Sequence, residues 1–116
     1  MSDDPVDADL LAWGKVIRLE TVGRRTGRPR VVTVGFVPAG GTALLVAAAS
    51  GSTDWALNLR ARGSCVVELD GERRPCTATE LGADVRATVV RELILKYGTP
   101  AERLGAGPAF RLDPTR

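Results

Sequence analysis

Two segments near the N-terminus have the residue pattern of neighbouring β-strands, with a short turn-like stretch between them. Val16–Val22 (VIRLETV) alternates apolar and polar side chains, and Val31–Val37 (VVTVGFV) is β-branched and largely apolar. The intervening Gly23–Arg30 (GRRTGRPR) is therefore expected to be a hairpin loop, in which Gly27 can take a left-handed backbone conformation. An antiparallel strand pair is thus the first element of the predicted fold.

A second hairpin is predicted around Asp70-Gly71, a dipeptide that is typical of two-residue turns. A turn at this point places Cys65 and Cys76 directly opposite each other on the two strands. Pro75 lacks a backbone N–H, so it favours an edge or a bulge of the second strand. We expect both thiols to be reduced residues of the sheet.

The remaining segments complete a mainly β pattern. Thr53 or Asp54 can cap a helix that Gly63 ends, while Gly98 closes a longer helix in which Val85, Val89 and Leu93 share one face. Further elements are expected as strands over 42–50, 64–69, 72–81 and 109–112 and as helices within 51–63 and over 84–97.

About six short antiparallel strands with two covering helices predict a mainly β, α+β fold: a small β-barrel with helical covers. A length of 116 residues is that of a single domain. We assign residues 10–116 to this domain, with a short helical turn at Leu10–Lys15. The acidic residues 1–9 are expected to form a flexible N-terminus.

Composition excludes several classes of protein. Apolar residues make up 44% and charged residues 26% of the chain, as in ordinary globular domains. The longest apolar run, Ala43–Ala49, is too short to span a membrane, and the acidic N-terminus is unlike a signal peptide, so we expect a cytoplasmic protein. With two cysteines and no histidine, neither a Ser-His-Asp triad nor an ordinary zinc site is expected. Any catalysis would rest on a bound cofactor.

The arginine-rich hairpin loop is the first candidate site. The net charge is only +2, yet residues 21–30 contain four arginines and no acid. Backbone N–H groups and neighbouring guanidinium groups can hold an anion. A solvated turn explains the same residues equally well. A nucleic-acid patch is the third reading, and the loop has no aromatic residue to stack on bases.

The second candidate is Ala47–Asn58 (AAASGSTDWALN), where a strand of small residues leads into a helix. Small side chains allow a flat ligand to approach the backbone, and a helix N-terminus favours negative groups. Trp55 is expected to be a core residue. Asn58, one turn later, is expected to turn inward and find a partner. Tyr97 is expected to pack at the end of its helix.

These two candidates, in this order, resemble the deazaflavin-dependent nitroreductase family, whose members are split β-barrels of the FMN-binding split-barrel-like type and use coenzyme F420. The resemblance rests on RLETVGRRTGRPR (18–30), AAASG (47–51) and DWALNLRAR (54–62). It departs from the better-known members at Ser50-Gly51-Ser52-Thr53, where these often have a lysine and a longer insert. Their tyrosine-lined substrate pocket is also not evident here, because Tyr97 is the only tyrosine.

The resemblance implies an oxidoreductase that passes a hydride from reduced F420 to an electron-poor small molecule such as a nitroaromatic, quinone or enone. FMN is the alternative cofactor, and a non-catalytic carrier or a nucleic-acid-binding barrel are the alternative functions. We expect no nucleic-acid partner, no membrane span, no metal, and either a monomer or a homodimer; no catalytic residue is assigned. The residues implied to bind the cofactor are Arg24, Arg25, Thr26, Gly27, Arg30, Ala48, Ala49, Ser50, Trp55 and Asn58.

Overall fold

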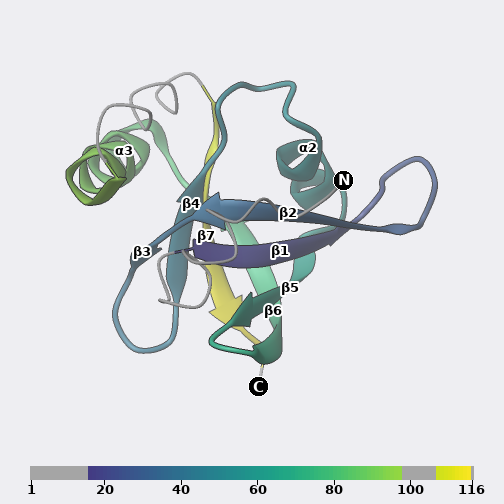
Figure 1. The fold of residues 1–116 in the computed structure, drawn as a ribbon. Coiled ribbons are helices and arrows are strands. Elements are labelled where there is room, and N and C mark those ends of the chain that lie inside the picture. Colours follow the sequence, from purple (N-terminus) through teal and green to yellow (C-terminus); the bar gives the residue numbers. More distant parts are fainter. Residues whose placement is uncertain (1–15, 98–106, 116) are drawn as a thin grey trace.

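The computed structural model describes residues 16–97 and 107–115, which form one curled antiparallel sheet with two helices (Figure 1). The predicted flexible segment 1–9 and the helical turn at Leu10–Lys15 lie outside the described residues. The elements are β1 (Val16–Val22), β2 (Pro29–Gly35), β3 (Val37–Pro38), β4 (Leu44–Ala47), α2 (Asp54–Arg62), β5 (Ser64–Leu69), β6 (Glu72–Glu80), α3 (Ala83–Tyr97) and β7 (Ala109–Pro114).

The strand order explains how the sheet closes into a split barrel. The order is β2-β1-β5-β6-β7-β4-β3, so β2 and β3 are the two edges of the sheet. Only Phe36 separates these two strands in the sequence. The sheet must therefore curl until its edges meet near this residue. The predicted single strand 31–37 is thus divided in two, and the described part of the chain contains seven strands where about six were predicted.

Helix α3 covers the closure point and the outer face of the sheet. The Tyr97 hydroxyl accepts a hydrogen bond from Phe36 N at 3.1 Å and lies 3.2 Å from Phe36 O, to which it donates. Lys96 Nζ also donates to Phe36 O, at 2.9 Å. The backbone N–H and C=O of Phe36 thus both have side-chain hydrogen-bond partners, as buried backbone groups require. The prediction that Tyr97 packs at its helix end is confirmed.

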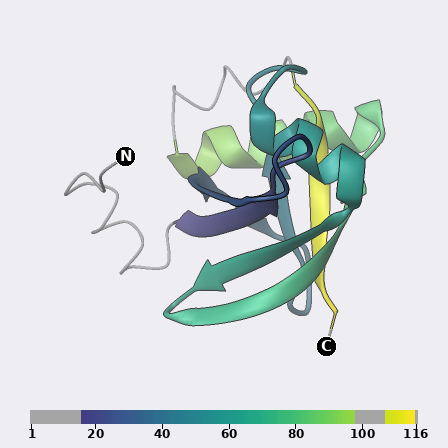
Figure 2. The ribbon, with the colours of Figure 1, turned by 90° about the vertical axis from the view of Figure 1, so that its right-hand side faces the viewer.

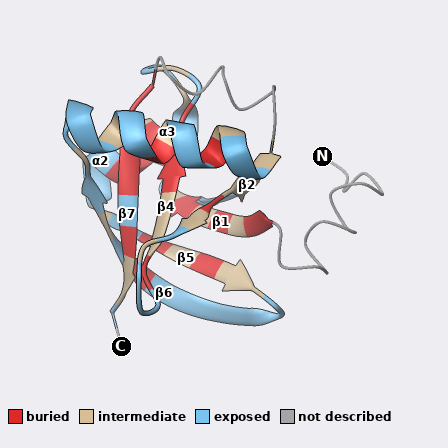
Figure 3. Cartoon of the chain, turned by 90° about the vertical axis from the view of Figure 1, so that its left-hand side faces the viewer, coloured by how far each residue is buried: buried red, intermediate tan, exposed pale blue. Residues whose placement is uncertain are grey.

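The same helix lies across β4 and β7, as Figure 3 shows. Val89 and Leu93 are buried there with Ala47 and Ala109. The predicted helix is confirmed, with Val85, Val89 and Leu93 on it at the expected spacing. Val85 is nevertheless 49% exposed, so only the second and third of these residues pack against the sheet.

The main core fills the interior of the barrel. Inward-facing residues of β1, such as Ile17 and Leu19, alternate with more exposed ones, as the sequence pattern predicts. They meet Leu112 of β7 and Trp55 of α2 in one cluster. Among the described residues, no helix has the length and apolar character needed to cross a membrane. The cytoplasmic location stays a prediction.

The second hairpin forms as predicted. Asp70 and Gly71 both have positive φ, 54° and 78°, as a type I′ turn requires. Cys65 lies opposite Cys76, and both thiols are free and buried. Counting back from the turn, this is a hydrogen-bonded pair of the ladder, in which the side chains are set farther apart than in the alternate pairs. The sheet geometry therefore suits two thiols packed side by side.

Pro75 occupies one of the alternate positions of β6, opposite Val66. Its backbone faces away from β5, and the ladder between β6 and β7 begins only at Cys76. Pro75 O accepts a hydrogen bond from Thr115 N at 3.0 Å. The missing N–H thus falls at an edge-like segment of the strand, as predicted.

Helix α2 covers one end of the barrel, beside the β1–β2 loop (Figure 2). It lies within the predicted 51–63, and the predicted ends are confirmed: Thr53 takes the N-cap position and Gly63 ends the helix with a φ of 67°. The Thr53 side chain makes no capping hydrogen bond and instead accepts one from Ser50 N at 3.2 Å. Strand β4 is shorter than the predicted 42–50, because it runs only from Leu44 to Ala47.

Candidate cofactor-binding site

The β1–β2 loop holds its own shape. Gly23 N donates to Arg28 O, and Gly27 N donates to Gly23 O, both at 2.8 Å. Gly27 has a φ of 72°, which confirms the predicted left-handed conformation. Thr26 Oγ1 accepts a hydrogen bond from Arg28 N at 3.2 Å, and a β-carbon on Gly23 would come within 2.7 Å of this oxygen. Thr26 therefore braces the loop from inside, and Gly23 leaves room for it.

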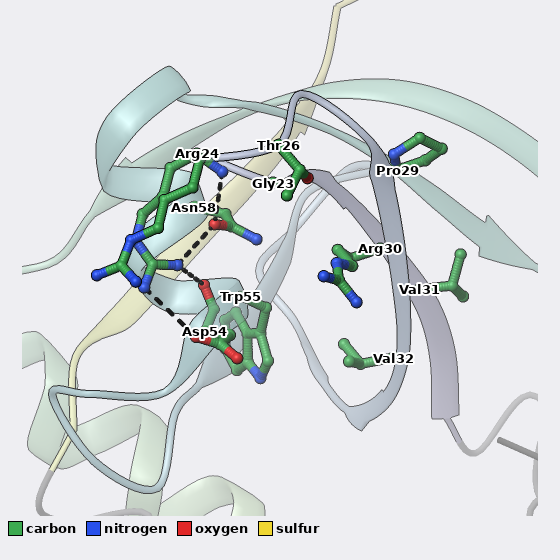
Figure 4. A pocket seen from close by; sticks show the side chains of 11 residues that line it. Gly23, Arg24, Thr26, Pro29, Arg30, Val31, Val32, Asp54, Trp55 and Asn58 are labelled. Carbon is green, nitrogen blue, oxygen red and sulfur yellow. Dashed lines mark hydrogen bonds and ion pairs between the residues drawn. The ribbon is translucent and has the colours of Figure 1, made fainter.

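Asn58 joins this loop to the barrel and to α2. Its side chain is buried, at 3% exposure, and its Nδ2 donates to Oγ1 of the equally buried Thr21 at 3.0 Å. Its Oδ1 accepts from Arg24 N at 3.1 Å and from Arg24 Nη1 at 2.9 Å (Figure 4). The prediction that Asn58 turns inward to a partner is confirmed. One amide thus connects β1, the loop and the helix.

Arg24 is also paired with the first residue of α2. Its Nη2 lies 3.4 Å from Asp54 Oδ1, and its Nη1 lies 3.5 Å from Asp54 O. These contacts are long, and the Asp54 side chain is 87% exposed, so solvent screens the ion pair. Arg24 is held mainly by the shorter hydrogen bonds to Asn58. Its guanidinium remains at the mouth of the site with one acid beside it.

A pocket of about 630 Å³ lies between the loop, β2 and α2. Arg25 and Arg30 are among its lining residues, and their guanidinium groups make no hydrogen bond or ion pair with any residue in 16–97 or 107–115. Val32 of β2 and Trp55 of α2 add apolar side chains to the lining. The lining residues are Gly23, Arg24, Arg25, Thr26, Pro29, Arg30, Val31, Val32, Asp54, Trp55 and Asn58.

Trp55 gives the pocket a fixed aromatic wall. Its side chain is only 7% exposed, and its ring centroid lies 6.1 Å from that of Phe110, with the planes tilted by 57°. The residue is thus a core anchor, as predicted, and also lines the pocket. Because the ring is packed from behind, its exposed edge is held in a constant position.

The predicted small-residue shelf lies elsewhere. Ala48 is buried in the core, and its N donates to Pro108 O at 2.8 Å. Ala49 is exposed, and Ser50 is engaged with Ser52 and Thr53 in the turn before α2. Among the described residues that line the pocket, none comes from positions 48–50. Their role at the cofactor stays a prediction.

Five lining residues are absent from the predicted set: Gly23, Pro29, Val31, Val32 and Asp54. The first two belong to the predicted loop, and the signal that could have found the two valines is their position directly after it. Asp54 was considered only as a helix cap. It lies at the pocket because the hydrogen bonds between Arg24 and Asn58 hold the loop next to the first turn of α2.

The donor set suits a ligand with two unlike parts. Guanidinium groups bind phosphate and carboxylate oxygens, whereas Trp55 and Val32 favour a flat, largely apolar ring system. A deazaflavin with a phosphate-bearing acidic tail has both parts, so the residues fit this cofactor. No group of three potential metal ligands occurs among the described residues.

The fold is a split β-barrel, and arginines and Trp55 line a pocket at one end of it. Residues 7–103 match the family described as F420H(2)-dependent quinone reductase. The chain belongs to this family: it is an F420-dependent oxidoreductase, with coenzyme F420 as its cofactor. The fold, the cofactor and the enzyme class implied by the sequence resemblance are thereby confirmed.

Several solved structures share the fold. An F420-H2 dependent reductase, FDR-A, is 22% identical, with 85% of this chain and 94% of that chain covered and a TM-score of 0.69. The heme storage protein HutZ from Vibrio cholerae is 21% identical, with 100% and 92% covered and a TM-score of 0.68. Rv2991 from Mycobacterium tuberculosis is 14% identical, with 100% and 82% covered and a TM-score of 0.72. At these identities the likeness establishes the split barrel alone.

Proposed function

We propose that the pocket between the β1–β2 loop and α2 binds F420 and that the chain uses it to reduce a quinone. The observation that carries this proposal is that Arg25, Arg30 and the fixed ring of Trp55 line the same pocket. The arginines would hold the phosphate and acidic tail, and Trp55 would orient the ring. Thr26 and Gly27 would act indirectly, by shaping the loop.

The chemistry comes from the bound cofactor, which in its reduced form supplies a hydride. A quinone that takes this hydride and one proton from solvent becomes a hydroquinone, so two electrons leave the reduced deazaflavin. The chain's own part is to bind, to orient and to exclude water. Val32 and Trp55 support this role, because they contribute apolar side chains to the pocket lining.

The quinone is proposed as the acceptor because the family description names it. Nitroaromatics and enones are also electron-poor and remain acceptors to compare. An experiment separates them: the purified chain is mixed with reduced F420 under anaerobic conditions, and formation of the oxidised cofactor is followed by absorbance with each acceptor in turn. The proposal expects the quinone to give the highest kcat/KM.

Binding is tested separately by titrating the chain into F420 and into FMN. Arg25→Gln and Arg30→Gln should each weaken F420 binding by about tenfold, because each removes a charge-assisted hydrogen-bond donor. Arg74→Gln is the matched control, since Arg74 pairs with Glu72 at the β5–β6 turn. Unchanged binding in both pocket variants would place the cofactor elsewhere on the barrel.

Two further measurements test the proposal: oxidation of reduced F420 by the acceptors, and the oligomeric state of the chain. Tight F420 binding without oxidation of the reduced form by any of the three acceptors would favour a carrier. A preference for FMN would overturn the assignment of the cofactor to this pocket. Light scattering of the purified chain distinguishes the monomer from the homodimer.

A further inference from the structure

We infer that Asn58 is a positioning residue that sets the anion affinity of the pocket by holding the arginine loop on α2. The inference rests on the proposed function, since it concerns how the F420 pocket is kept in shape. It assigns Asn58 no contact with the cofactor. The residue acts on binding through Arg24 and the loop.

The Asn58 side chain is already engaged by the protein. Its Oδ1 accepts from both the backbone and the side chain of Arg24, and its Nδ2 donates to Thr21 Oγ1. A primary amide offers an acceptor and a donor on one planar group, and both are needed here. Because Asn58 is buried, leaving either end of its amide without a hydrogen-bond partner would destabilise the folded protein.

The loop has few other attachments to the barrel end. Apart from the strand ladder and the bonds to Asn58, its hydrogen bonds to described residues lie within the loop itself, between Gly23, Thr26, Gly27 and Arg28, or join Arg24 to Asp54. Among the described residues, Asn58 therefore provides the buried part of the connection between the loop and α2. Without it, the exposed and screened contact to Asp54 would have to hold the loop alone.

A pre-positioned loop matters because ordering flexible groups reduces affinity. Arg25 lies next to Arg24 in the chain, and both line the pocket. A loop released from α2 would have to be ordered again each time that an anion binds. Loss of Asn58 should thus weaken F420 binding although every arginine is still present.

The first measurement is made on the cofactor-free protein. The Arg24 amide hydrogen is bonded to Asn58 Oδ1, so its exchange with solvent reports the connection directly. In Asn58→Ala this amide should exchange about tenfold faster or more, and trypsin should cut after Arg24 and Arg25 sooner. Arg60→Gln is the control, because Arg60 lies on the same helix and pairs with Glu80 away from the pocket.

Asn58→Asp distinguishes the effect of loop position on F420 binding from the effect of charge. It is also the second variant to use if Asn58→Ala does not fold. A carboxylate of the same size keeps the acceptor for Arg24, and the Thr21 hydroxyl can rotate to donate to it. The Arg24 amide should stay protected in this variant. F420 binding should still weaken, because a negative charge now lies beside the anion site.

The salt dependence of F420 binding distinguishes the loss of affinity in Asn58→Asp from that in Asn58→Ala. The deficit of Asn58→Asp should shrink as ionic strength rises, since it is electrostatic, whereas that of Asn58→Ala should persist. Wild-type exchange at Arg24 in Asn58→Ala, or loss of Arg24 protection in Asn58→Asp, would overturn the inference. Failure of the wild-type chain to bind F420 would instead overturn the proposed function, and the exchange data on the free protein would still decide the role of Asn58.

Discussion

The ring of Tyr97 lies directly against Gly35, the last residue of β2: a β-carbon on this glycine would come within 2.9 Å of Tyr97 Cε2 and 3.0 Å of Cζ. Gly35→Ala should therefore displace the ring and its hydrogen bonds to Phe36. We expect a loss of about 1–3 kcal/mol in the free energy of unfolding, measured in urea.

Gly51→Ala is the control for this substitution. Gly51 has no neighbour within 4 Å of an added β-carbon. Its replacement should change the free energy of unfolding by less than about 0.5 kcal/mol. Equal stability of the two variants would show that Tyr97 does not fix the end of β2.

Gly107 makes an even closer approach, to the backbone of the turn after β4. A β-carbon there would overlap the carbonyl of Ala48 and come within 2.7 Å of Ser50 N. Because both neighbours are backbone atoms, Gly107→Ala should cost more than about 3 kcal/mol in thermal or urea unfolding. Gly82→Ala, with no neighbour within 4 Å, should be close to neutral. A stable Gly107→Ala protein would contradict the crossing of these two segments.

Alkaline pH should destabilise the fold through Cys65. Burial, and then the neighbouring Cys76, raise the pKa of Cys65 from 9.0 to about 12. The thiol stays protonated in the folded chain while the unfolded chain ionises, so its stabilising contribution is complete below pH 9.0 and is lost as pH rises toward about 12. In this window Cys65→Ala should flatten the fall in unfolding free energy, by at most about 1.4 kcal/mol per pH unit. Identical slopes for the two proteins would contradict the raised pKa.

Asp54 is the one acid among the described residues that line the pocket. Its carboxylate lies beside Arg24 and opposes a bound anion. Asp54→Asn should tighten F420 binding by about twofold to fivefold at low salt, and the gain should fade at high salt. The substitution also removes a favourable charge at the start of α2, at a cost of about 0.3–1 kcal/mol.

The control for this prediction is Asp84→Asn, which removes a first-turn acid from α3 instead. It should cost similar stability and leave F420 affinity unchanged. Weaker binding in Asp54→Asn would mean that the carboxylate helps to present Arg24.

Local patterns were sufficient to predict most elements, because turn residues and alternation act within a few positions. β1 and β5 have the predicted bounds, and the Asp70-Gly71 turn sets the register of Cys65 and Cys76. The predicted strand 31–37 was too long for a different reason. Phe36 leaves the ladder because Tyr97, which is remote in sequence, takes its backbone groups.

The site was predictable only in part. Asn58 turns inward to partners as expected, since an amide so close to the core needs them, but the sequence did not indicate that one partner is Arg24 of the loop. The role of Ala48 at the cofactor, which the resemblance implies, stays a prediction. Its backbone contacts Gly107 and Pro108, and nothing near Ala48 in the sequence indicates this contact.

Strand β2 has different duties at its two ends. Its first residues line the pocket next to the arginine loop, and its last leads into Phe36, where the barrel closes. The loop can thus change in length or charge without disturbing the closure, as long as Asn58 keeps its partners. An engineer seeking a new anionic ligand would vary Arg25 and Arg30 and leave Arg24 and Gly35 unchanged, because Arg24 is the partner of Asn58 and Gly35 makes room for Tyr97 at the closure.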